Sequence, residues 1–424
     1  MIFEDNFFNQ FIQKPSKGKE RIYRFLSKVG HPQKKINKTI HITGTNGKGS
    51  TIAFLHSCLK ANKLSSNVYT SPHLLKINER FIINDEIISD DLLSHITNKF
   101  INIHDDKELS FFEFITSCAL ELFSKSNSDW NLIEVGMGGL HDPTNIIERK
   151  DLSIITTISY DHEEFLGKDL KMIAEEKLGI IPDGGFAIFG PQEKFLKQII
   201  LDHLNKKNAK GIFYNQDWFI ERRGDQIIYQ DKAGELKFET LGLDGEYQIL
   251  NAGLCIASLK SLHRMNKIDI SDEIIIQGLK NTKLLGRLSK LTSNIEAIID
   301  KGSEVLIDGC HNPSAAKIIS QEMINLNSKE KKNLFIILGL SRNRSLTDFI
   351  LNFKGIAKEI TIIPIEGIKS ASLKDIKNKT IFSNEVLQES KSLKEAIQKY
   401  SKFKNSRILI CGSLYLVSEA LKIN

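Results

Sequence analysis

The sequence predicts an α/β fold in two domains, each built around a parallel β-sheet. From about Thr39 onward, short runs rich in β-branched residues alternate with segments of helical pattern, which is typical of βαβ units. A second series of the same kind begins near Glu304. The length of 424 residues also exceeds the usual size of a single hydrophobic core. We therefore assign residues 1–285 to a first domain and residues 286–424 to a second.

The first domain begins with a strand, a glycine-rich loop and a helix. The run TIHIT, which ends at Thr43, predicts a buried strand, and residues 49–61 predict the helix behind it. Apolar residues at helical spacing predict a further helix over residues 111–123. Additional strands are expected at residues 132–135, 153–158 and 186–189.

Residues 211–241 have a different pattern. The segments GIFY, WFIERR, QIIYQ and LKFET alternate polar with apolar residues and are separated by Asn-Gln-Asp, Gly-Asp and Ala-Gly turns. Alternation of period two between short turns is typical of antiparallel strands. We expect all four segments to form a small antiparallel β insertion in the first domain.

The second domain repeats the βα pattern. Its expected strands are EVLID, NLFIILGL, EITIIPI and RILIC, and helices are expected between them at residues 314–325 and 392–401. We expect the link between the domains within residues 285–301, although no stretch rich in Pro, Gly or Ser marks it.

The composition excludes several classes of protein. The net charge of +6 is small for this length, which argues against a nucleic-acid-binding protein and is compatible with anionic small molecules. The N-terminus has no signal-peptide pattern, and no apolar run is long enough to span a bilayer. The five cysteines are dispersed, without a CxxC pair, which argues against a disulfide framework or a zinc site. We expect a cytoplasmic protein that binds neither nucleic acid nor membrane.

The segment HITGTNGKGST, residues 41–51, has the properties of a phosphate-binding loop. Its glycines permit positive φ and close approach of backbone N–H groups to a phosphate, and the following helix N-terminus favours an anion. Lys48 is placed to reach the β- and γ-phosphates, and Ser50 or Thr51 to help hold Mg²⁺. The spacing differs from GxxxxGK[ST], because Ile42 occupies the place of the first glycine. The predicted nucleotide-binding residues are Gly44, Thr45, Asn46, Gly47, Lys48, Gly49, Ser50 and Thr51.

The loop GTNGKGS resembles that of the Mur ligase superfamily, in the form found in folylpolyglutamate synthases and dihydrofolate synthases. Further motifs follow in the family's order from about residue 39 to 315. The resemblance implies a P-loop Mur-ligase-type ATPase domain followed by a Rossmann-like glutamate-ligase domain. It also implies ATP and Mg²⁺ as cofactors, L-glutamate and a folate or pteroate as small-molecule substrates, and we expect a monomer.

Glu134 is a candidate metal ligand. It ends a predicted strand just before the turn GMGG, and open α/β sheets form their sites at the carboxyl ends of strands. The family's ExGxGG motif assigns this glutamate to magnesium. By the same resemblance, Ser71 of the SPHL loop and His162 of the DHxxxLG motif are the other ligands, although a nitrogen ligand is unusual for Mg²⁺. Lys177, in AEEKLGI, corresponds to a lysine that is carbamylated in relatives and supports a second metal.

Two segments are implied to contact the acceptor. Ser110, Phe111, Phe112 and Glu113 resemble the family's T-x-F-E stretch, although an aromatic cluster at helical spacing is also typical of a core. His141, Asp142 and Pro143 lie where the family usually has G-G-R-L-D-A-T-N. Leu140 replaces the family's arginine there, and Pro143 replaces its alanine, so the identity of the acceptor is open between dihydropteroate, tetrahydrofolate and both.

Further motifs concern ATP and the reacting centre. Asn251 belongs to the motif GxxQxxNA, Arg287 to GRL, and Asp308 and His311 to DGCHNP, in which Cys310 replaces the family's alanine. The resemblance places Asn251, Arg287 and Asp308 near the nucleotide, with Arg287 at the γ-phosphate. His311 is a candidate for proton transfer from the attacking amine.

The segment after the strand NLFIILGL departs from the family. An acidic D-K-D is usual there, whereas this chain has Ser341-Arg342-Asn343-Arg344. Guanidinium groups bind carboxylates in a bidentate way, so Arg342 and Arg344 are candidates for binding glutamate or a polyglutamate tail.

The predicted reaction is ATP-dependent amide formation. The acceptor carboxylate attacks the γ-phosphorus to give an acyl phosphate, and the amine of L-glutamate then displaces phosphate. Two alternatives stay open at this point. A peptidoglycan-precursor ligase would usually have a separate domain for the uridine nucleotide, and only about 38 residues precede the first strand here. A non-catalytic nucleotide-binding regulatory module is favoured by Leu140 and by the missing D-K-D, and disfavoured by the intact Lys48.

Overall fold

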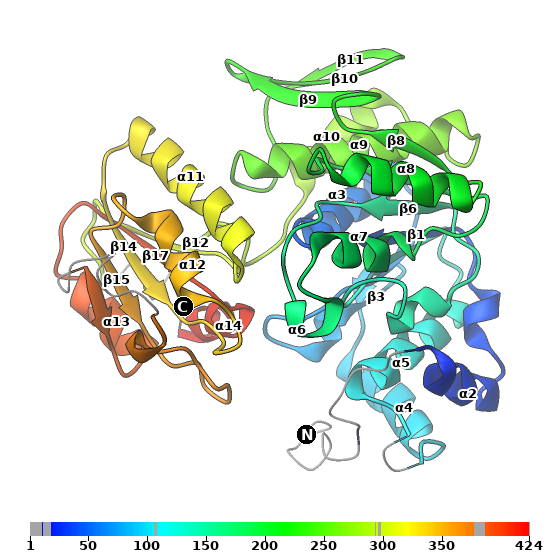
Figure 1. Ribbon diagram of the computed structural model, residues 1–424, viewed down its shortest axis with the longest axis horizontal. Coiled ribbons are helices and arrows are strands. Elements are labelled where there is room, and N and C mark those ends of the chain that lie inside the picture. Colours follow the sequence, from blue (N-terminus) through cyan, green and yellow to red (C-terminus); the bar gives the residue numbers. More distant parts are fainter. Residues whose placement is uncertain are drawn as a thin grey trace. The chain divides into compact units, whose positions relative to one another are not determined.

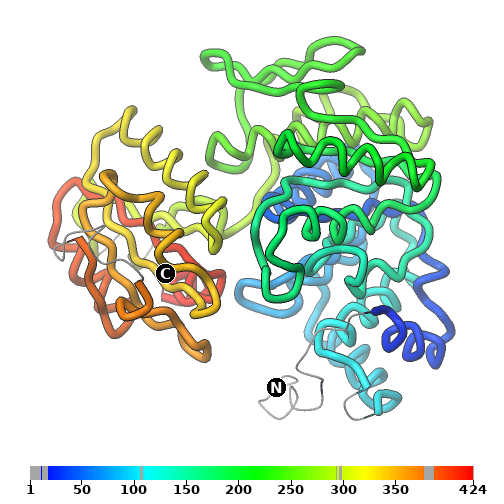
Figure 2. Tube along the Cα trace, in the orientation of Figure 1, coloured from blue at the N-terminus to red at the C-terminus, as the bar shows by residue number. Residues whose placement is uncertain are grey.

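The computed structural model in Figure 1 describes residues 11, 18–105, 108–292, 294–295, 298–376 and 386–423. The first ten residues, where a signal peptide would lie, fall outside these ranges. The described chain forms two compact units, and each of them consists of two separate segments of the sequence. The first unit contains the residues up to Gly242 together with Gln248–Lys283, and the second contains Leu243–Tyr247 and the residues from Leu284 onward. In Figure 2 the second unit is mostly the yellow-to-red part of the trace.

An eight-stranded sheet forms the centre of the first unit, in the order β4-β3-β2-β5-β1-β6-β7-β8. All pairs are parallel except β2–β3 and β3–β4. Every residue of β1 is buried, as expected for a strand at the centre of a sheet covered on both faces. The strands are β1 (Thr39–Thr43), β2 (Ser66–Tyr69), β3 (Phe81–Ile83), β4 (Glu86–Ile87), β5 (Trp130–Glu134), β6 (Leu152–Ile155), β7 (Phe186–Phe189) and β8 (Lys210–Phe213).

Helices cover this sheet and supply its hydrophobic cores. α2, α4 and α5 share one core with β2, β3 and β5, whereas α7 and α8 share another with β6 and β7. α3 packs against α10. The helices are α2 (Glu20–Lys28), α3 (Lys48–Ala61), α4 (Asp90–Ile101), α5 (Phe111–Lys125), α6 (Glu163–Leu166), α7 (Leu170–Leu178), α8 (Leu196–Lys206), α9 (Tyr247–Arg264) and α10 (Asp272–Asn281), with 3₁₀ turns at Pro32–Lys35, Ile77–Arg80 and Pro143–Ile146.

The expected antiparallel insertion contains three strands rather than four. β9 (Trp218–Arg223), β10 (Gln226–Asp231) and β11 (Gly234–Phe238) form a separate antiparallel sheet. The segment GIFY was wrongly assigned to it, because β8 pairs in parallel with β7 in the main sheet. The rings of Phe189 and Phe213 stack across this pair with centroids 4.8 Å apart, so β8 extends the apolar surface of the main sheet.

The second unit contains a six-stranded sheet in the order β12-β13-β17-β14-β15-β16, in which only the β12–β13 pair is antiparallel. Residues 285–301 were expected to link the domains, but they contain β12 and belong to this unit. The strands are β12 (Ser289–Leu291), β13 (Glu304–Ile307), β14 (Asn333–Leu338), β15 (Glu359–Ile362), β16 (Leu387–Glu389) and β17 (Ser406–Cys411). The helices are α11 (Pro313–Lys329), α12 (Leu346–Ile350), α13 (Leu393–Tyr400) and α14 (Leu414–Ile423), with 3₁₀ turns at Leu351–Phe353 and Leu373–Asp375.

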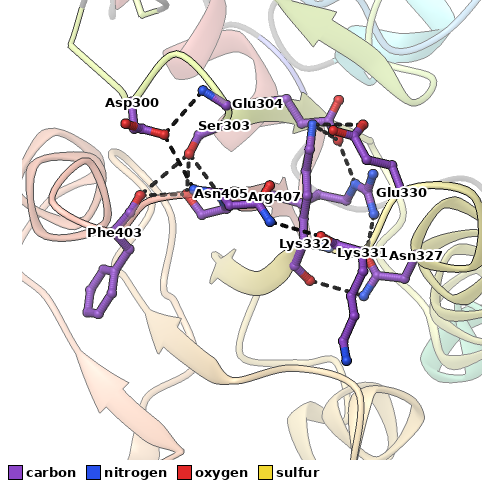
Figure 3. A network of polar contacts seen from close by, with 12 residues as sticks. Asp300, Ser303, Glu304, Asn327, Glu330, Lys331, Lys332, Phe403, Asn405 and Arg407 are labelled. Carbon is purple, nitrogen blue, oxygen red and sulfur yellow. Dashed lines mark hydrogen bonds and ion pairs between the residues drawn. The ribbon is translucent and has the colours of Figure 1, made fainter.

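A polar network joins the amino ends of three strands in the second sheet (Figure 3). The Arg407 guanidinium, only 3% exposed, donates through Nε to Glu304 Oε1 at 2.7 Å, and Lys332 Nζ lies 3.3 Å from the same oxygen. The Ser303 and Ser406 hydroxyls are 2.9 Å apart. These contacts fasten one edge of the sheet, while its carboxyl-end loops carry the motifs of the candidate site. In the parts of the chain that the structure describes, every helix is too short or too polar to cross a bilayer.

Candidate functional site

The phosphate-binding loop lies between β1 and α3 and is held by residues that follow β6. Gly44 and Gly47 have φ values of 148° and 89°, as the sequence predicts for such a loop. The Thr45 hydroxyl donates to Ser159 O at 2.9 Å and accepts from Ser159 N at 3.0 Å. Thr156 Oγ1 donates to Asn46 O at 2.6 Å. The backbone of the loop is therefore positioned by the protein itself.

Asn251, on α9, contacts this loop. A Cβ atom at Gly47 would lie 2.4 Å from Asn251 Oδ1, so only glycine allows the backbone to approach this amide so closely. The Asn251 amide is oriented by a hydrogen bond from its Nδ2 to Gln248 Oε1 at 2.8 Å. The structure thus brings two separate predicted nucleotide-binding segments together.

Two lysines meet at the carbonyl of Gly44. Lys48 Nζ donates to Gly44 O at 3.1 Å, and Lys177 Nζ donates to the same oxygen at 2.9 Å. Burial, followed by the charge of Lys48, lowers the pKa of Lys177 to about 7. Lys177 therefore has an amine that is partly neutral near neutral pH, which an exposed lysine would not have.

Ser50 and Thr51 lie in the first turn of α3 and are buried. The Thr51 hydroxyl has no hydrogen-bond partner among the described residues. Buried hydroxyls are nearly always paired, so this one is suited to a ligand or to water bound at the loop.

Glu134 and Ser71 lie next to each other beside the loop. Glu134 ends β5, which pairs with β1, and its Oε2 accepts from Ser71 N at 3.3 Å. The same oxygen would be 3.9 Å from a Cβ at Gly49, in the first turn of α3. A carboxylate and a hydroxyl at this place are the hard oxygen donors that Mg²⁺ prefers, so these residues fit the metal.

His162 directly precedes α6, at its N-cap position, in a left-handed conformation with φ of 52°. Its Nε2 lies 3.9 Å from Asp161 Oδ2. Within the described ranges, no three His, Cys, Asp or Glu side chains gather as a metal-binding group. The predicted set contains only two such residues with a serine, so a magnesium role for His162 stays a prediction.

Asp142 supports the turn that follows Glu134. Its Oδ2 accepts from Met137 N at 2.9 Å, and its Oδ1 accepts from Thr144 N at 3.0 Å. Burial raises the pKa of Asp142 to about 6. His141 is more exposed, with Nδ1 2.6 Å from Glu176 Oε1, and Pro143 begins a 3₁₀ turn. Acceptor binding by these residues stays a prediction, and Asp142 has a structural function in any case.

The predicted acceptor segment 110–113 forms the N-terminus of α5. Ser110 and Glu113 form a capping box, and Arg21 Nη2 pairs with the buried Glu113 Oε2 at 2.9 Å. Phe111 and Phe112 pack against the hydrophobic core, and a Cβ at Gly136 would lie 2.4 Å from the Phe112 ring. Both aromatic rings therefore take part in hydrophobic packing, which was the alternative to acceptor binding. Phe112 also lies against the glycine-rich turn that follows Glu134.

Asp308 joins two loops of the second unit. Its Oδ2 accepts from Leu288 N at 2.9 Å and from the Tyr247 hydroxyl at 3.1 Å, and its Oδ1 accepts from Cys310 N at 2.8 Å. Arg287 lies against Gly309, where a Cβ would be 2.5 Å from Nη1. His311 Nδ1 is 3.2 Å from Gly309 O. Arg287, Asp308 and His311 are thus brought together at the carboxyl ends of β13 and β17.

The segment 341–344 pairs with a neighbouring loop of the second unit. Arg342 N donates to Lys369 O at 2.9 Å, and a β-bridge joins Ser341 and Ser370. The Arg342 guanidinium is 53% exposed, with Nε 3.3 Å from Asp375 Oδ1. Partial burial lowers the pKa of Arg344. The backbones of Arg342 and Lys369 therefore lie next to each other, in the segments that follow β14 and β15.

Several residues that hold the site in place carry no motif of their own. Thr156 and Ser159 lie after the end of β6, and Tyr247 directly precedes Gln248 in the GxxQxxNA motif. Their positions next to a predicted strand or a recognised motif could have marked them as candidates. Their hydrogen-bond partners are distant in sequence, so no local pattern marks them.

Comparison with known proteins identifies relatives of both units. The family model "Mur ligase middle domain" matches residues 42–259, and the model "Dihydrofolate synthetase, C-terminal domain" matches residues 291–423. A probable dihydrofolate synthetase of Schizosaccharomyces pombe is 30% identical over 95% of this chain and 97% of its own length. A dihydrofolate synthase/folylpolyglutamate synthase of Haemophilus influenzae is 28% identical over 95% of this chain and 92% of its own.

Solved structures give the same result. The structure of Escherichia coli FolC in complex with DHPP and ADP has a TM-score of 0.85 and 25% identity, and covers 99% of this chain and 96% of that one. A bifunctional folylpolyglutamate synthase/dihydrofolate synthase from Yersinia pestis, complexed with AMPPNP and Mn ion, has a TM-score of 0.83 and 25% identity, and covers 97% and 94%.

Proposed function

This chain belongs to the dihydrofolate synthase and folylpolyglutamate synthase family of Mur ligases, and we propose that it joins L-glutamate to a folate-type acceptor with conversion of ATP to ADP and phosphate. It is an ATP-dependent ligase by this membership. The observation that carries the proposal is the arrangement at the phosphate loop. Lys48, Lys177 and Asn251 all contact the loop, and Glu134 lies beside it.

The reaction begins with transfer of the γ-phosphoryl group. An acceptor carboxylate oxygen attacks the γ-phosphorus, the bond to the β-phosphate oxygen breaks, and an acyl phosphate and ADP result. Such a transfer needs positioning and charge neutralisation more than covalent chemistry. Lys48 supplies a cation for this, the resemblance to the family assigns Arg287 the same task, and the loop N–H groups bind the phosphates. Ser71, Glu134 and His162 would hold Mg²⁺, which supplies further neutralisation of phosphate charge when bound.

The second step forms the amide. The amine of L-glutamate, as the free base, attacks the acyl carbon, phosphate leaves, and the nitrogen loses a proton. His311 is our candidate to accept that proton, on the basis of its place in the family motif DGCHNP; its Nδ1 lies 3.2 Å from Gly309 O.

The acceptor is dihydropteroate, tetrahydrofolate or both. Names of the relatives include both activities, and the E. coli structure contains DHPP. Leu140 is exposed at the place where the family usually has an arginine, so the preference of this chain needs its own measurement.

The test offers each acceptor separately to the purified protein with ATP, Mg²⁺ and L-glutamate. Product mass and phosphate release are followed, with Lys48→Ala as the inactive variant. A mass gain of one glutamate on either acceptor, absent in Lys48→Ala, supports the ligase and identifies its substrate. ATP binding without a mass gain on either acceptor contradicts the folate assignment and favours another ligase substrate or a non-catalytic role.

We also propose that Arg342 and Arg344 bind the carboxylates of glutamate or of a polyglutamate tail. The Arg342 guanidinium is exposed, its backbone lies next to that of Lys369, and a substrate carboxylate would compete with Asp375 for it. The double replacement Arg342→Gln/Arg344→Gln should raise the KM for glutamate about 10-fold or more, since hydrogen bonds to charged groups are involved. An unchanged glutamate KM would refute this assignment.

The remaining expectations concern the state of the protein in the cell. We propose that it acts as a monomer in the cytoplasm. The five cysteines are buried and unpaired as disulfides, which is compatible with a reducing compartment. Light scattering of the purified chain tests the monomer, and a mass of twice the chain would contradict it.

A further inference from the structure

Tyr247 belongs to the second unit although the helix that it begins belongs to the first. Leu243–Tyr247 groups with the second unit, whereas Gln248 onward groups with the first. The Tyr247 ring packs against the hydrophobic core around β13, β14 and β17. The backbone N–H of Glu246 donates to Glu322 Oε2 at 2.9 Å, which fastens the preceding residue to α11. Tyr247 is therefore placed by the second unit's own packing.

The Tyr247 hydroxyl donates to Asp308, which is the residue that joins the two loops of the candidate site. Asp308 Oδ2 also accepts the N–H of Leu288, directly after Arg287. Asp308 Oδ1 accepts the N–H of Cys310, directly before His311. A further hydrogen bond from Gly309 N to Gly286 O, at 3.0 Å, joins the same loops. The carboxylate thus fixes the residues next to both candidate functional side chains.

The arrangement requires Asp308 to be ionised. Burial raises the pKa of Asp308, and Arg287, the two N–H groups and the Tyr247 hydroxyl oppose that rise. The groups that face Asp308 are Arg287, Tyr247 and the Cys310 thiol. A protonated carboxyl would lose part of its capacity to accept hydrogen bonds. The Tyr247 hydroxyl therefore helps to preserve the charge that holds the loops together.

We propose that Tyr247 is a positioning residue for the ligase reaction, which acts through Asp308 to fix Arg287 and His311. The expected effect on kcat rests on the proposed function, whereas the contact between Tyr247 and Asp308 does not. The phosphate loop takes no part in this contact, so its loss affects the orientation of Arg287 and His311 more than the binding of phosphate by the loop.

The test replaces Tyr247 by Phe, which removes the hydroxyl and keeps the ring. We expect kcat to fall about 10-fold or more, since a hydrogen bond to a charged group is lost. The Kd of ADP should change less than kcat does, because the phosphate loop itself is unaffected. The acid limb of the kcat–pH profile should move to higher pH, because Asp308 loses a donor to its ionised form.

Tyr229→Phe is the matched control. Its hydroxyl donates to Asp231 Oδ2 at 3.2 Å within the small antiparallel sheet, so the same kind of bond is lost away from the site. We expect wild-type kcat in this variant. An equal loss of kcat in Tyr229→Phe and Tyr247→Phe would show that the effect is general and would overturn the proposal.

A double-mutant cycle with Asp308→Asn separates positioning from general destabilisation. If Tyr247 acts through Asp308, adding Tyr247→Phe to Asp308→Asn should reduce kcat less than about twofold further. If the two replacements lower kcat independently, so that their effects multiply in the double variant, Tyr247 does not act through Asp308. Wild-type kcat in Tyr247→Phe would also refute the proposal. Thermal unfolding of each variant shows whether it is folded.

The proposed function is tested by the wild-type arm of the same assay. If wild-type protein transfers no glutamate, the pH dependence of unfolding still tests the contact. Burial already raises the pKa of Asp308, and loss of the Tyr247 hydroxyl should raise it further, so Tyr247→Phe should lose more stability than the wild type as the pH rises above the ordinary range of an aspartate. Parallel stability curves would overturn the contact itself.

Discussion

Lys177 is a residue whose chemistry depends on its burial. The side chain is 3% exposed, and its Nζ donates a hydrogen bond to a backbone carbonyl, Gly44 O. With a pKa of about 7, roughly half of the amine is neutral near neutral pH, against roughly one molecule in a few thousand for an ordinary lysine. The neutral amine is the form that reacts with CO₂ to give a carbamate and a proton.

We predict that Lys177 is carbamylated and that ligase activity depends on it. Exchange into CO₂-free buffer should lower kcat, and ¹³C-bicarbonate should restore it with a new carbamate signal by NMR. Since carbamylation needs the neutral amine, the signal should grow as the pH rises from about 6 to about 8. Lys177→Met should lack the signal, whereas exposed Lys171→Met should keep it. A wild-type protein that is fully active without CO₂ would contradict the prediction.

Helix α5 shows one polar cluster with two possible functions. Ser110 caps the helix, and Glu113 satisfies both Ser110 and Arg21 while it is buried. These contacts account for the residue types without any ligand. The resemblance to the family nevertheless places the same turn at the acceptor, and the two functions have different consequences on mutation.

Ser110→Ala should destabilise the protein by about 1 kcal/mol through loss of the cap. If the segment also contacts the acceptor, the acceptor KM should rise in addition. Ser124→Ala, on the same helix, is the control, because its hydroxyl donates to Glu121 O within the helix. Urea unfolding and acceptor saturation curves give both quantities. Lost stability with an unchanged acceptor KM would leave α5 with the structural function alone.

Helices α3 and α10 approach each other closely at Gly278. A Cβ there would lie 2.4 Å from Cys58 Cα and 2.8 Å from Cys58 N, so the clash is with backbone. Because α3 continues directly from the phosphate loop, a shift of this helix moves the loop as well.

Gly278→Ala should therefore lower stability by about 1–3 kcal/mol or more and weaken ADP binding. The control is Gly302→Ala, where a Cβ would meet its nearest neighbour at 3.4 Å, and which should leave ADP binding unchanged. Isothermal titration of ADP and thermal unfolding measure the two effects. Normal ADP affinity in a destabilised Gly278→Ala protein would show that the contact between α3 and α10 does not position the phosphate loop.

At the scale of the whole molecule, buried lysines make stability depend on pH. Burial, followed by the charge of Lys19, lowers the pKa of Lys150 to about 7, and the pKa of the unmodified Lys177 amine is also about 7. The Lys150 ammonium donates to Ile180 O at 2.7 Å and to Asn145 Oδ1. Between these folded-state values and the ordinary pKa of lysine, the unfolded chain binds more protons than the folded chain.

The free energy of unfolding should therefore rise with pH between about pH 7 and about pH 9, by at most about 1.4 kcal/mol per pH unit for each lysine. Lys150→Met should flatten this dependence, whereas exposed Lys168→Met should not. Urea unfolding at a series of pH values measures the slope. A wild-type stability that is flat or falls over this interval would contradict the prediction.

Much of the fold could be predicted from the sequence because the signals are local. The buried run TIHIT, the glycine loop and the helix after it depend on residues within a few positions of one another, and β1 and α3 lie where they were expected. The fold class is confirmed in the same way, by alternating strands and helices in both units. Roles of individual site residues stay predictions, since the bound molecules define them.

What the sequence determined by itself was the type of each element and the chemistry of the loops, because periodicity and glycine placement act over short distances. Only the tertiary structure decided which elements pair. GIFY joins β7 rather than the insertion, and Tyr247 joins Asp308 although the helix that follows it belongs to the other unit. Lys177 likewise meets Gly44 across 133 residues of sequence. These pairings depend on burial and hydrogen bonds between segments that are distant in sequence, so local sequence patterns do not predict them.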